Sequence, residues 1–149
     1  MPETEFHDDY QFLERSQRLT HEEILKVARV ATGLGVSKLR LTGGEPLLDK
    51  KLPALVEGLA ALPGVDDLAL TTNAMLLAPV AADLANAGLQ RVTISLDSLD
   101  EEVFRKMSGG RGDLGQVMQG LEAAAEAGLA PIKINVVVER GVNDHTILD

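Results

Sequence analysis

Lys38-Leu39-Arg40-Leu41-Thr42-Gly43-Gly44-Glu45-Pro46 is the stretch around which this chain is organised. Its alternation predicts a short strand, because the cationic and hydroxyl side chains fall on one face and the two leucines on the other. The strand ends in two glycines, and a ligand can approach their backbone groups closely because no side chain stands in the way. Taken alone, the same residues also suit a tight strand-to-helix turn with an exposed Glu45.

The composition fits one soluble globular domain. The chain has 149 residues, of which 45% are hydrophobic and 25% charged, and this is enough for a hydrophobic core. A net charge of −9 and an aromatic content of only 3% disfavour nucleic acid as a partner. A small anionic ligand, held by a few local cations, remains compatible with this charge.

The sequence contains no cysteine, so it offers neither disulfides nor thiolate ligands for a metal. The three histidines lie far apart and lack the spacing of a metal site, and we expect no metal ligands in this chain. There is no signal peptide and no apolar run long enough to span a bilayer. We therefore expect a cytoplasmic protein that does not contact a membrane.

Helical and extended patterns alternate along the chain, after a polar stretch at residues 1–18 that we expect to be a loop. Thr20 and Glu23 form a capping box, which predicts a helix from there to about Thr32. Further helices are expected from about 53 to 62, over 78–87, from 98 to 107 and over 114–127. Strands are expected over 37–42, 67–71, 91–96 and 131–138.

Four helices are expected to end in a glycine followed by an apolar residue, which is typical of a left-handed C-terminal cap. The pairs are Gly35-Val36, Gly64-Val65, Gly88-Leu89 and Gly128-Leu129. A strand begins a few residues after each pair. This repeated alternation with short connections predicts right-handed β/α units and a parallel sheet. The pattern alone does not separate an open sheet from a barrel.

Each of the four strands has one apolar and one polar face. Strand by strand, the residues on the polar face are Lys38, Arg40 and Thr42; Ala69, Thr71 and Asn73; Thr93, Ser95 and Asp97; and Lys133 and Asn135. Ala69 is the one apolar residue among them. The apolar faces must pack under the helices, whereas unpaired charges in a dry interior would be costly. We therefore expect a wet lumen that holds a polar, anionic ligand towards the strand C-termini. The alternative is a solvent-facing sheet, which is uncommon for parallel strands.

Four motifs carry a resemblance to a known family. Gly43-Gly44-Glu45-Pro46 resembles the "GGEP" motif of radical S-adenosylmethionine (SAM) enzymes, whose backbone holds the methionine amino group. Three further motifs narrow the match: Thr71-Thr-Asn, Ser95-Leu-Asp-Ser-Leu-Asp and Lys133-Ile-Asn-Val-Val-Val. Together they fall in the order seen in the GTP 3′,8-cyclases of molybdenum cofactor (molybdopterin) biosynthesis. The resemblance implies a partial (βα)6 TIM-like barrel of the radical SAM type, with about four βα units and parallel strands.

The resemblance also implies site residues and small-molecule partners. Gly44 and Ser95 are expected to contact SAM, with Gly43, Glu45, Asn73 and Asp97 as further SAM contacts. Arg40, Thr71 and Lys133 are expected to contact GTP, and the two cations suit its triphosphate. No residue of this chain is expected to be catalytic in its own right.

In the family, a [4Fe–4S] cluster on Cys-x3-Cys-x2-Cys cleaves SAM reductively to a radical that converts GTP to 3′,8-cyclo-GTP, a lyase reaction. Met-Pro-Glu commonly follows the last cysteine there, and this chain opens with Met1-Pro2-Glu3. We therefore expect residues 1–149 to be a single incomplete core domain, without the first strand, the cluster loop and the C-terminal region. Such a fragment is expected to be inactive by itself.

Two other functions remain open from the sequence. Lys133, mid-strand in a polar lumen with Arg40 as a phosphate holder, also suits a Schiff-base lyase of the aldolase type. A non-catalytic nucleotide-binding domain is the second alternative. Whatever the function, an open edge at strand 37–42 is expected to favour a homodimer or self-association.

Overall fold

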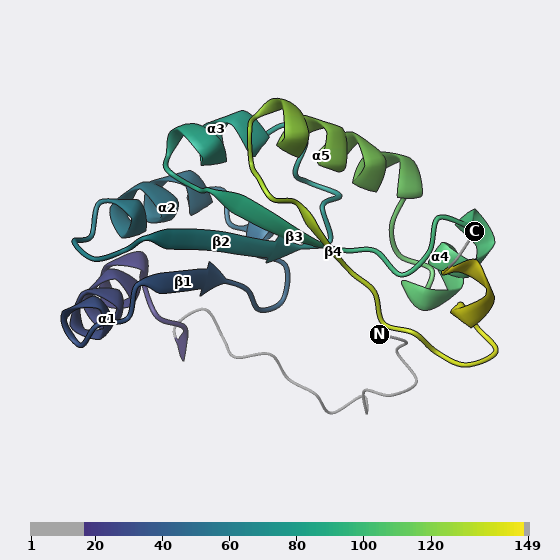
Figure 1. Ribbon diagram of the computed structural model, residues 1–149, viewed down its shortest axis with the longest axis horizontal. Helices are drawn as coiled ribbons and strands as arrows, with labels where there is room; N and C mark the ends of the chain where they lie inside the picture. Colours follow the sequence, from purple (N-terminus) through teal and green to yellow (C-terminus); the bar gives the residue numbers. More distant parts are fainter. Residues whose placement is uncertain (1–16, 148–149) are drawn as a thin grey trace.

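A computed structural model describes residues 17–147 of the chain (Figure 1). The predicted N-terminal loop therefore lies almost wholly outside the described residues. Four strands form one parallel sheet in the order β1-β2-β3-β4. Their bounds are β1 Lys38–Leu41, β2 Asp67–Thr72, β3 Arg91–Ser95 and β4 Lys133–Asn135. Helices alternate with the strands, so the α/β partial barrel-like fold predicted from the sequence is confirmed.

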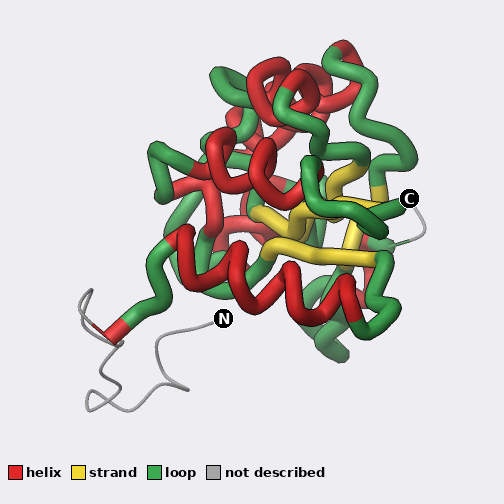
Figure 2. Tube along the Cα trace, turned by 90° about the vertical axis from the view of Figure 1, so that its left-hand side faces the viewer, coloured by secondary structure: helices red, strands yellow, loops and turns green. Residues whose placement is uncertain are grey.

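Three helices cover one face of this sheet: α2 (Leu52–Ala60), α3 (Ala81–Asn86) and α5 (Leu114–Glu126) (Figure 1). The first helix, α1 (His21–Gly33), packs beside α2 and lies nearest the viewer in Figure 2. At the C-terminal ends of the strands lie α4 (Glu101–Met107) and the 3-10 turn η4 (Asp144–Thr146) (Figure 1). A second 3-10 turn, η3 (Pro46–Leu48), follows β1.

The helix ends follow the signals in the sequence. Thr20 and Glu23 form the predicted capping box at the start of α1. The glycines of all four predicted caps adopt positive φ angles, between 77° and 103°. After α1, α3 and α5, the residue following that glycine donates its N–H to a carbonyl five residues back, which closes the last turn.

The hydrophobic core lies between the sheet and its helices. Leu68, Leu70, Val92 and Ile94 point to this side and are at most 1% exposed. They pack with residues of α2, α3 and α5 such as Leu59, Leu84 and Val117, also almost fully buried. The alternation predicted for β2 and β3 is therefore confirmed, and it leaves the polar positions on the opposite face of the sheet.

Several boundaries differ from those predicted, and the helix expected from 98 begins only at Glu101, after the N-cap Asp100. The last strand was expected over 131–138, but β4 spans only Lys133–Asn135. Val136, Val137 and Val138 leave the sheet and are 37%, 60% and 56% exposed, although their β-branched side chains continue the strand pattern. The helix expected over 78–87 begins only at Ala81, because turns closed by Leu77 and Val80 come first. No described helix combines the length and apolar character needed to cross a bilayer.

Candidate functional site

The glycine turn after β1 leaves its backbone open to a ligand. Gly43 and Gly44 have φ angles of 100° and 44°, a left-handed conformation that side-chain-bearing residues rarely adopt. A Cβ atom added to either glycine would meet no other protein atom within 4 Å. The glycines are therefore required by the backbone conformation, and the space beside them is free to hold part of a ligand.

Glu45 fixes this turn to the end of the neighbouring strand. Its Oε1 accepts hydrogen bonds from the Thr72 hydroxyl (2.7 Å) and the Leu47 N–H (3.1 Å), and its Oε2 accepts one from the Asn73 N–H (2.8 Å). These bonds start η3 and hold the end of β1 against the end of β2. In this structure the carboxylate expected to contact SAM is engaged with the protein and sets the position of the two glycines.

Arg40 reaches across the polar face of three strands. Its Nη1 donates to the hydroxyl of Thr71 on β2 (3.3 Å) and to that of Thr93 on β3 (3.4 Å). Lys133 on β4 pairs in register with Thr93, which itself pairs with Thr71. The three residues expected to contact GTP therefore lie on one face of the sheet, and Thr93 lies between them.

The residues expected to contact SAM lie one step further along the strands. Ser95 pairs in register with Asn135, and Asn73 follows the end of β2. Asp97 comes two residues after Ser95, and its Oδ1 accepts the Val137 N–H (2.9 Å). Thr71 and Lys133 thus share one register row with Thr93, and the Arg40 side chain reaches this row from a position opposite Ala69. The SAM candidates lie beyond this row, at the strand ends.

The polar face of the sheet is cationic although the chain as a whole is acidic. Lys38, Arg40, Arg91 and Lys133 lie on this face and outnumber Asp67 and Asp97, whereas the net charge of the chain is −9. Arg40 and Lys133 are exposed and remain available to an anion. A local excess of positive charge attracts anionic ligands.

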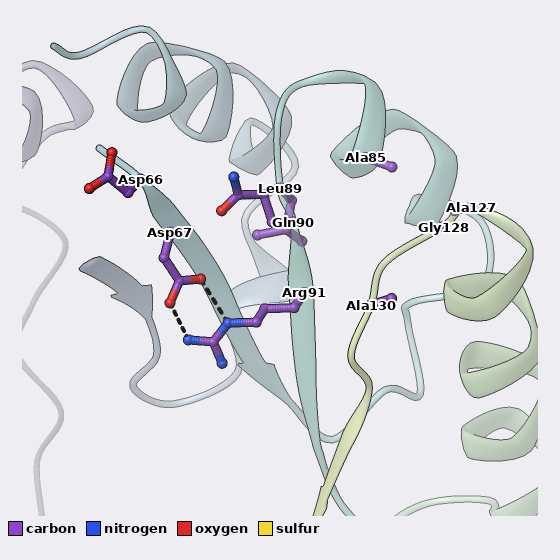
Figure 3. Close-up of a pocket in the computed structure, with 9 residues that line it drawn as sticks. All are labelled: Asp66, Asp67, Ala85, Leu89, Gln90, Arg91, Ala127, Gly128 and Ala130. Atoms are coloured by element: carbon purple, nitrogen blue, oxygen red, sulfur yellow. Dashed lines mark hydrogen bonds and ion pairs between the residues drawn. The ribbon is translucent and has the colours of Figure 1, made fainter. Parts of the chain in front are cut away.

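Asp67 and Arg91 form an ion pair at the opposite, N-terminal ends of β2 and β3 (Figure 3). Arg91 Nε donates to Asp67 Oδ1 (2.7 Å), and Nη2 donates to Oδ2. The bidentate contact with Arg91 lowers the pKa of the Asp67 carboxyl, and the charges of Lys38 and Arg40 add to this effect. The sequence prediction missed this pair, although extending the polar alternation of both strands back to their first residues would have found it.

An open hollow of about 600 Å³ lies beside this ion pair, lined by residues that include Asp66, Gln90 and Ala130 (Figure 3). It lies at the N-terminal ends of the strands, away from the glycine turn that follows β1. In α/β folds, ligands bind outside the carboxyl ends of the strands. We therefore place the candidate site at the glycine turn and the cationic face, and not in this hollow.

The comparisons with known proteins point to one superfamily. The family model of the Radical SAM superfamily matches residues 4–149. A GTP 3′,8-cyclase of Xanthomonas campestris pv. campestris (strain 8004) is 51% identical over 148 residues, covering 99% of this chain and 43% of that protein. GTP 3′,8-cyclases of Acidothermus cellulolyticus and Moorella thermoacetica are 51% and 52% identical, over 99% and 86% of this chain. The chain thus spans less than half the length of these curated relatives.

Proposed function

The chain belongs to the radical SAM superfamily, and from this membership we propose that it forms the ligand-holding part of a GTP 3′,8-cyclase, with SAM and GTP bound at its strand ends. The observation that carries the proposal is the convergence of Arg40, Thr71 and Thr93 on a cationic face, beside Lys133 and beneath an open glycine turn. In the whole enzyme this arrangement would serve the biosynthesis of the molybdenum cofactor.

The residues at the glycine turn fit SAM. The backbone of Gly43 and Gly44 is accessible, and the strand-end row offers the Ser95 hydroxyl and the Asp97 carboxylate. The amino group of the methionine moiety donates hydrogen bonds, which backbone carbonyl and carboxylate oxygens accept. The methionine end of SAM therefore suits this row. When bound, SAM supplies the hydrogen-abstraction chemistry of the family, and these residues hold and orient it.

The residues of the row below fit a triphosphate. Guanidinium and ammonium groups bind phosphate oxygens through charge-assisted hydrogen bonds, and the two threonine hydroxyls can donate to further oxygens. Thr71 and Thr93 also hold the Arg40 guanidinium in place before a ligand arrives. Such preorganisation lowers the entropy cost of binding.

The superfamily also implies a [4Fe–4S] cluster, and the residues of this chain do not fit one. The sequence contains no cysteine, and no cluster of three or more His, Asp or Glu residues in the range 17–147 could hold a metal. The proposal for this chain is therefore limited to binding and orientation, and no step runs through the cluster.

A Schiff-base lyase finds less support in the structure. A nucleophilic lysine needs a desolvated environment or a cationic neighbour that favours its neutral form. Lys133 is exposed, and its register partner is the hydroxyl residue Thr93. An exposed ammonium of this kind suits phosphate binding better than covalent catalysis.

Calorimetric titration of the chain with GTP and with SAM tests the proposed function. A charge-assisted hydrogen bond to phosphate contributes about 1.5–3 kcal/mol, so Arg40→Ala and Lys133→Ala should each weaken GTP binding roughly ten- to a hundredfold. Both should leave SAM affinity nearly intact. Ser95→Ala should show the opposite preference.

Lys38→Ala is the matched control, because Lys38 lies on the same face of β1 as Arg40 but pairs in register with Asp67, at the end of the sheet away from the glycine turn. It should change neither affinity. A loss of GTP binding in Lys38→Ala equal to that in Arg40→Ala, or unchanged GTP binding in Lys133→Ala, would show that the ligand lies elsewhere.

A further inference from the structure

Asn143 is the most deeply buried polar residue that the structure describes. Its exposed fraction is 0%, compared with 3%, 5% and 7% for Thr72, Ser98 and Thr93. It lies eight residues after the end of β4 and immediately before η4. A buried amide is costly unless each of its polar atoms finds a partner, so its hydrogen bonds indicate what it does.

The Asn143 side chain joins two segments that are distant in sequence. Its Nδ2 donates to the carbonyl oxygens of Asp97 and Val137, both at 2.8 Å, and its Oδ1 accepts the Glu139 N–H at 2.7 Å. Both N–H donors and the carbonyl acceptor of the amide are therefore used. The result is a bridge between the chain that leaves β3 and the chain that leaves β4.

This bridge begins where the backbone pairing of β3 and β4 ends. The last backbone hydrogen bond between the two strands runs from the Leu96 N–H to the Asn135 carbonyl (3.1 Å). Beyond it, the Asp97 carboxylate accepts the Val137 N–H, and the Asn143 amide links the carbonyls of the same two residues. Side chains thus replace the ladder and hold the two strand ends together.

A second contact supports the same arrangement. The Thr146 hydroxyl lies 2.9 Å from that of Ser98 in the β3–α4 connection and donates to the Asn143 carbonyl at 3.0 Å. Ser98 Oγ also accepts the Asp100 N–H at the start of α4. The segment around η4 is therefore attached to the β3–α4 connection at both Asn143 and Thr146.

We propose that Asn143 is a positioning residue that sets the spacing between the C-terminal ends of β3 and β4. β3 ends at Ser95, two residues before Asp97, and β4 ends at Asn135, two residues after its first residue, Lys133. If the proposed function holds, Asn143 fixes SAM-contacting residues relative to a GTP-contacting residue without touching either ligand. The ends of β3 and β4 would separate without it, because β4 contributes only three residues to the sheet.

Amide hydrogen exchange, resolved by residue, tests the proposal without any ligand. Asn143→Asp keeps the volume of the side chain and replaces its two N–H donors by an oxygen, whereas Asn143→Ala removes the bridge altogether. In both variants the Leu96 and Val137 amides should exchange at least about tenfold faster, because each lies at the bridge or at the last ladder bond. The Glu139 amide should do so in Asn143→Ala only, because Asp keeps the oxygen that accepts its N–H. Exchange at Leu70, in the centre of β2, should stay unchanged.

Asn86→Asp is the matched control, because it makes the same change in charge on an exposed residue of α3. It should leave all four amides unchanged.

The outcomes separate this proposal from the proposed function. Unchanged exchange at Leu96, Val137 and Glu139 would overturn it, and so would an equal acceleration at Leu70, because Asn143 would then only stabilise the whole fold. Titrations with SAM and with GTP should show roughly tenfold weaker SAM binding in Asn143→Asp, and unchanged affinities would remove its link to the ligand site. Wild-type protein that binds neither ligand would contradict the proposed function alone, since the exchange data still decide the role of Asn143.

Discussion

Glu45 shows that a motif residue can act through its neighbours. The sequence pattern suggested a carboxylate exposed to a ligand, but its oxygens accept hydrogen bonds from Leu47, Thr72 and Asn73. Thr72 belongs to the apolar parity of β2 and is 3% exposed, so its hydroxyl needs a buried partner, and Glu45 provides it. The glycine turn is consequently held in place before any ligand binds.

The Asp67–Arg91 pair predicts a pH dependence of stability. Arg91 lowers the pKa of Asp67 in the folded protein, so the carboxylate stabilises the fold above its unfolded pKa of about 3.9. This stabilisation is lost as the pH falls through the lower, folded pKa. Asp67→Asn should therefore be less stable than wild type at pH 6, and the difference should shrink progressively below about pH 4.

Urea denaturation at several pH values measures this difference. Asp66→Asn is a suitable control, because Asp66 is exposed and precedes Asp67 in the chain, whereas Arg91 pairs with Asp67. Its stability difference from wild type at pH 6 should be small. A constant difference between wild type and Asp67→Asn from pH 6 to pH 3 would show that the ion pair does not contribute through ionisation.

At the scale of elements, Gly120 determines how closely α5 approaches the loop after β2. A Cβ at this position would lie 2.4 Å from the Ala74 carbonyl oxygen and 3.2 Å from the Cβ atoms of Ala74 and Leu77. The obstacle is backbone, which cannot rotate away as a flexible side chain could. Gly120→Ala should therefore force α5 or the loop to move, at a cost of about 1–3 kcal/mol in the free energy of unfolding.

Gly33→Ala provides the matched control, because Gly33 is also helical and a Cβ there would meet no atom within 4 Å. Alanine is the better helix former, so this variant should be as stable as wild type or slightly more stable. Chemical denaturation of both variants measures the contrast. Equal stability of Gly120→Ala and wild type would mean that the loop carrying Asn73 adapts without strain.

Local signals made most elements predictable from the sequence. The capping box, the glycine caps and the alternation of β2 and β3 depend on residues within a few positions of one another, so a single sequence contains them. The end of β4 was not predictable in this way. Val136 to Val138 favour a strand, but the Asn143 amide takes over the role of the ladder there, and one of its partners is 46 residues away.

For the molecule as a whole, strand parity predicted which residues share a face but not how they are arranged on it. Alternation placed Arg40, Thr71 and Lys133 together, and the structure does bring them to one face. The order along the strands, with the SAM candidates beyond the row of Thr71, Thr93 and Lys133, follows from register. Register depends on how neighbouring strands are offset, and no pattern in the sequence indicates that offset. The spacing between the SAM and GTP candidates could therefore be found only from the structure.

The surface of the described residues predicts self-association. Val27, Val30 and Leu34 form a stripe along α1 and are 60%, 65% and 82% exposed. Within residues 17–147, β1 pairs with β2 alone, so its other edge presents unpaired backbone groups. An apolar stripe together with an open strand edge favours contact between copies of the chain. Wild-type protein should therefore sediment faster as its concentration rises.

The stripe should contribute more to association than the strand edge does, because Lys38 and Arg40 place charges on β1 that oppose strand pairing. The double variant Val30→Lys, Leu34→Lys should then sediment as a monomer over the same concentration range. Val138→Lys is the matched control, since Val138 is 56% exposed but follows β4 at the far edge of the sheet. It should associate like wild type. A wild-type sedimentation coefficient that does not change with concentration would show that the stripe and the edge do not bring copies together, and that the charges on β1 are enough to protect it.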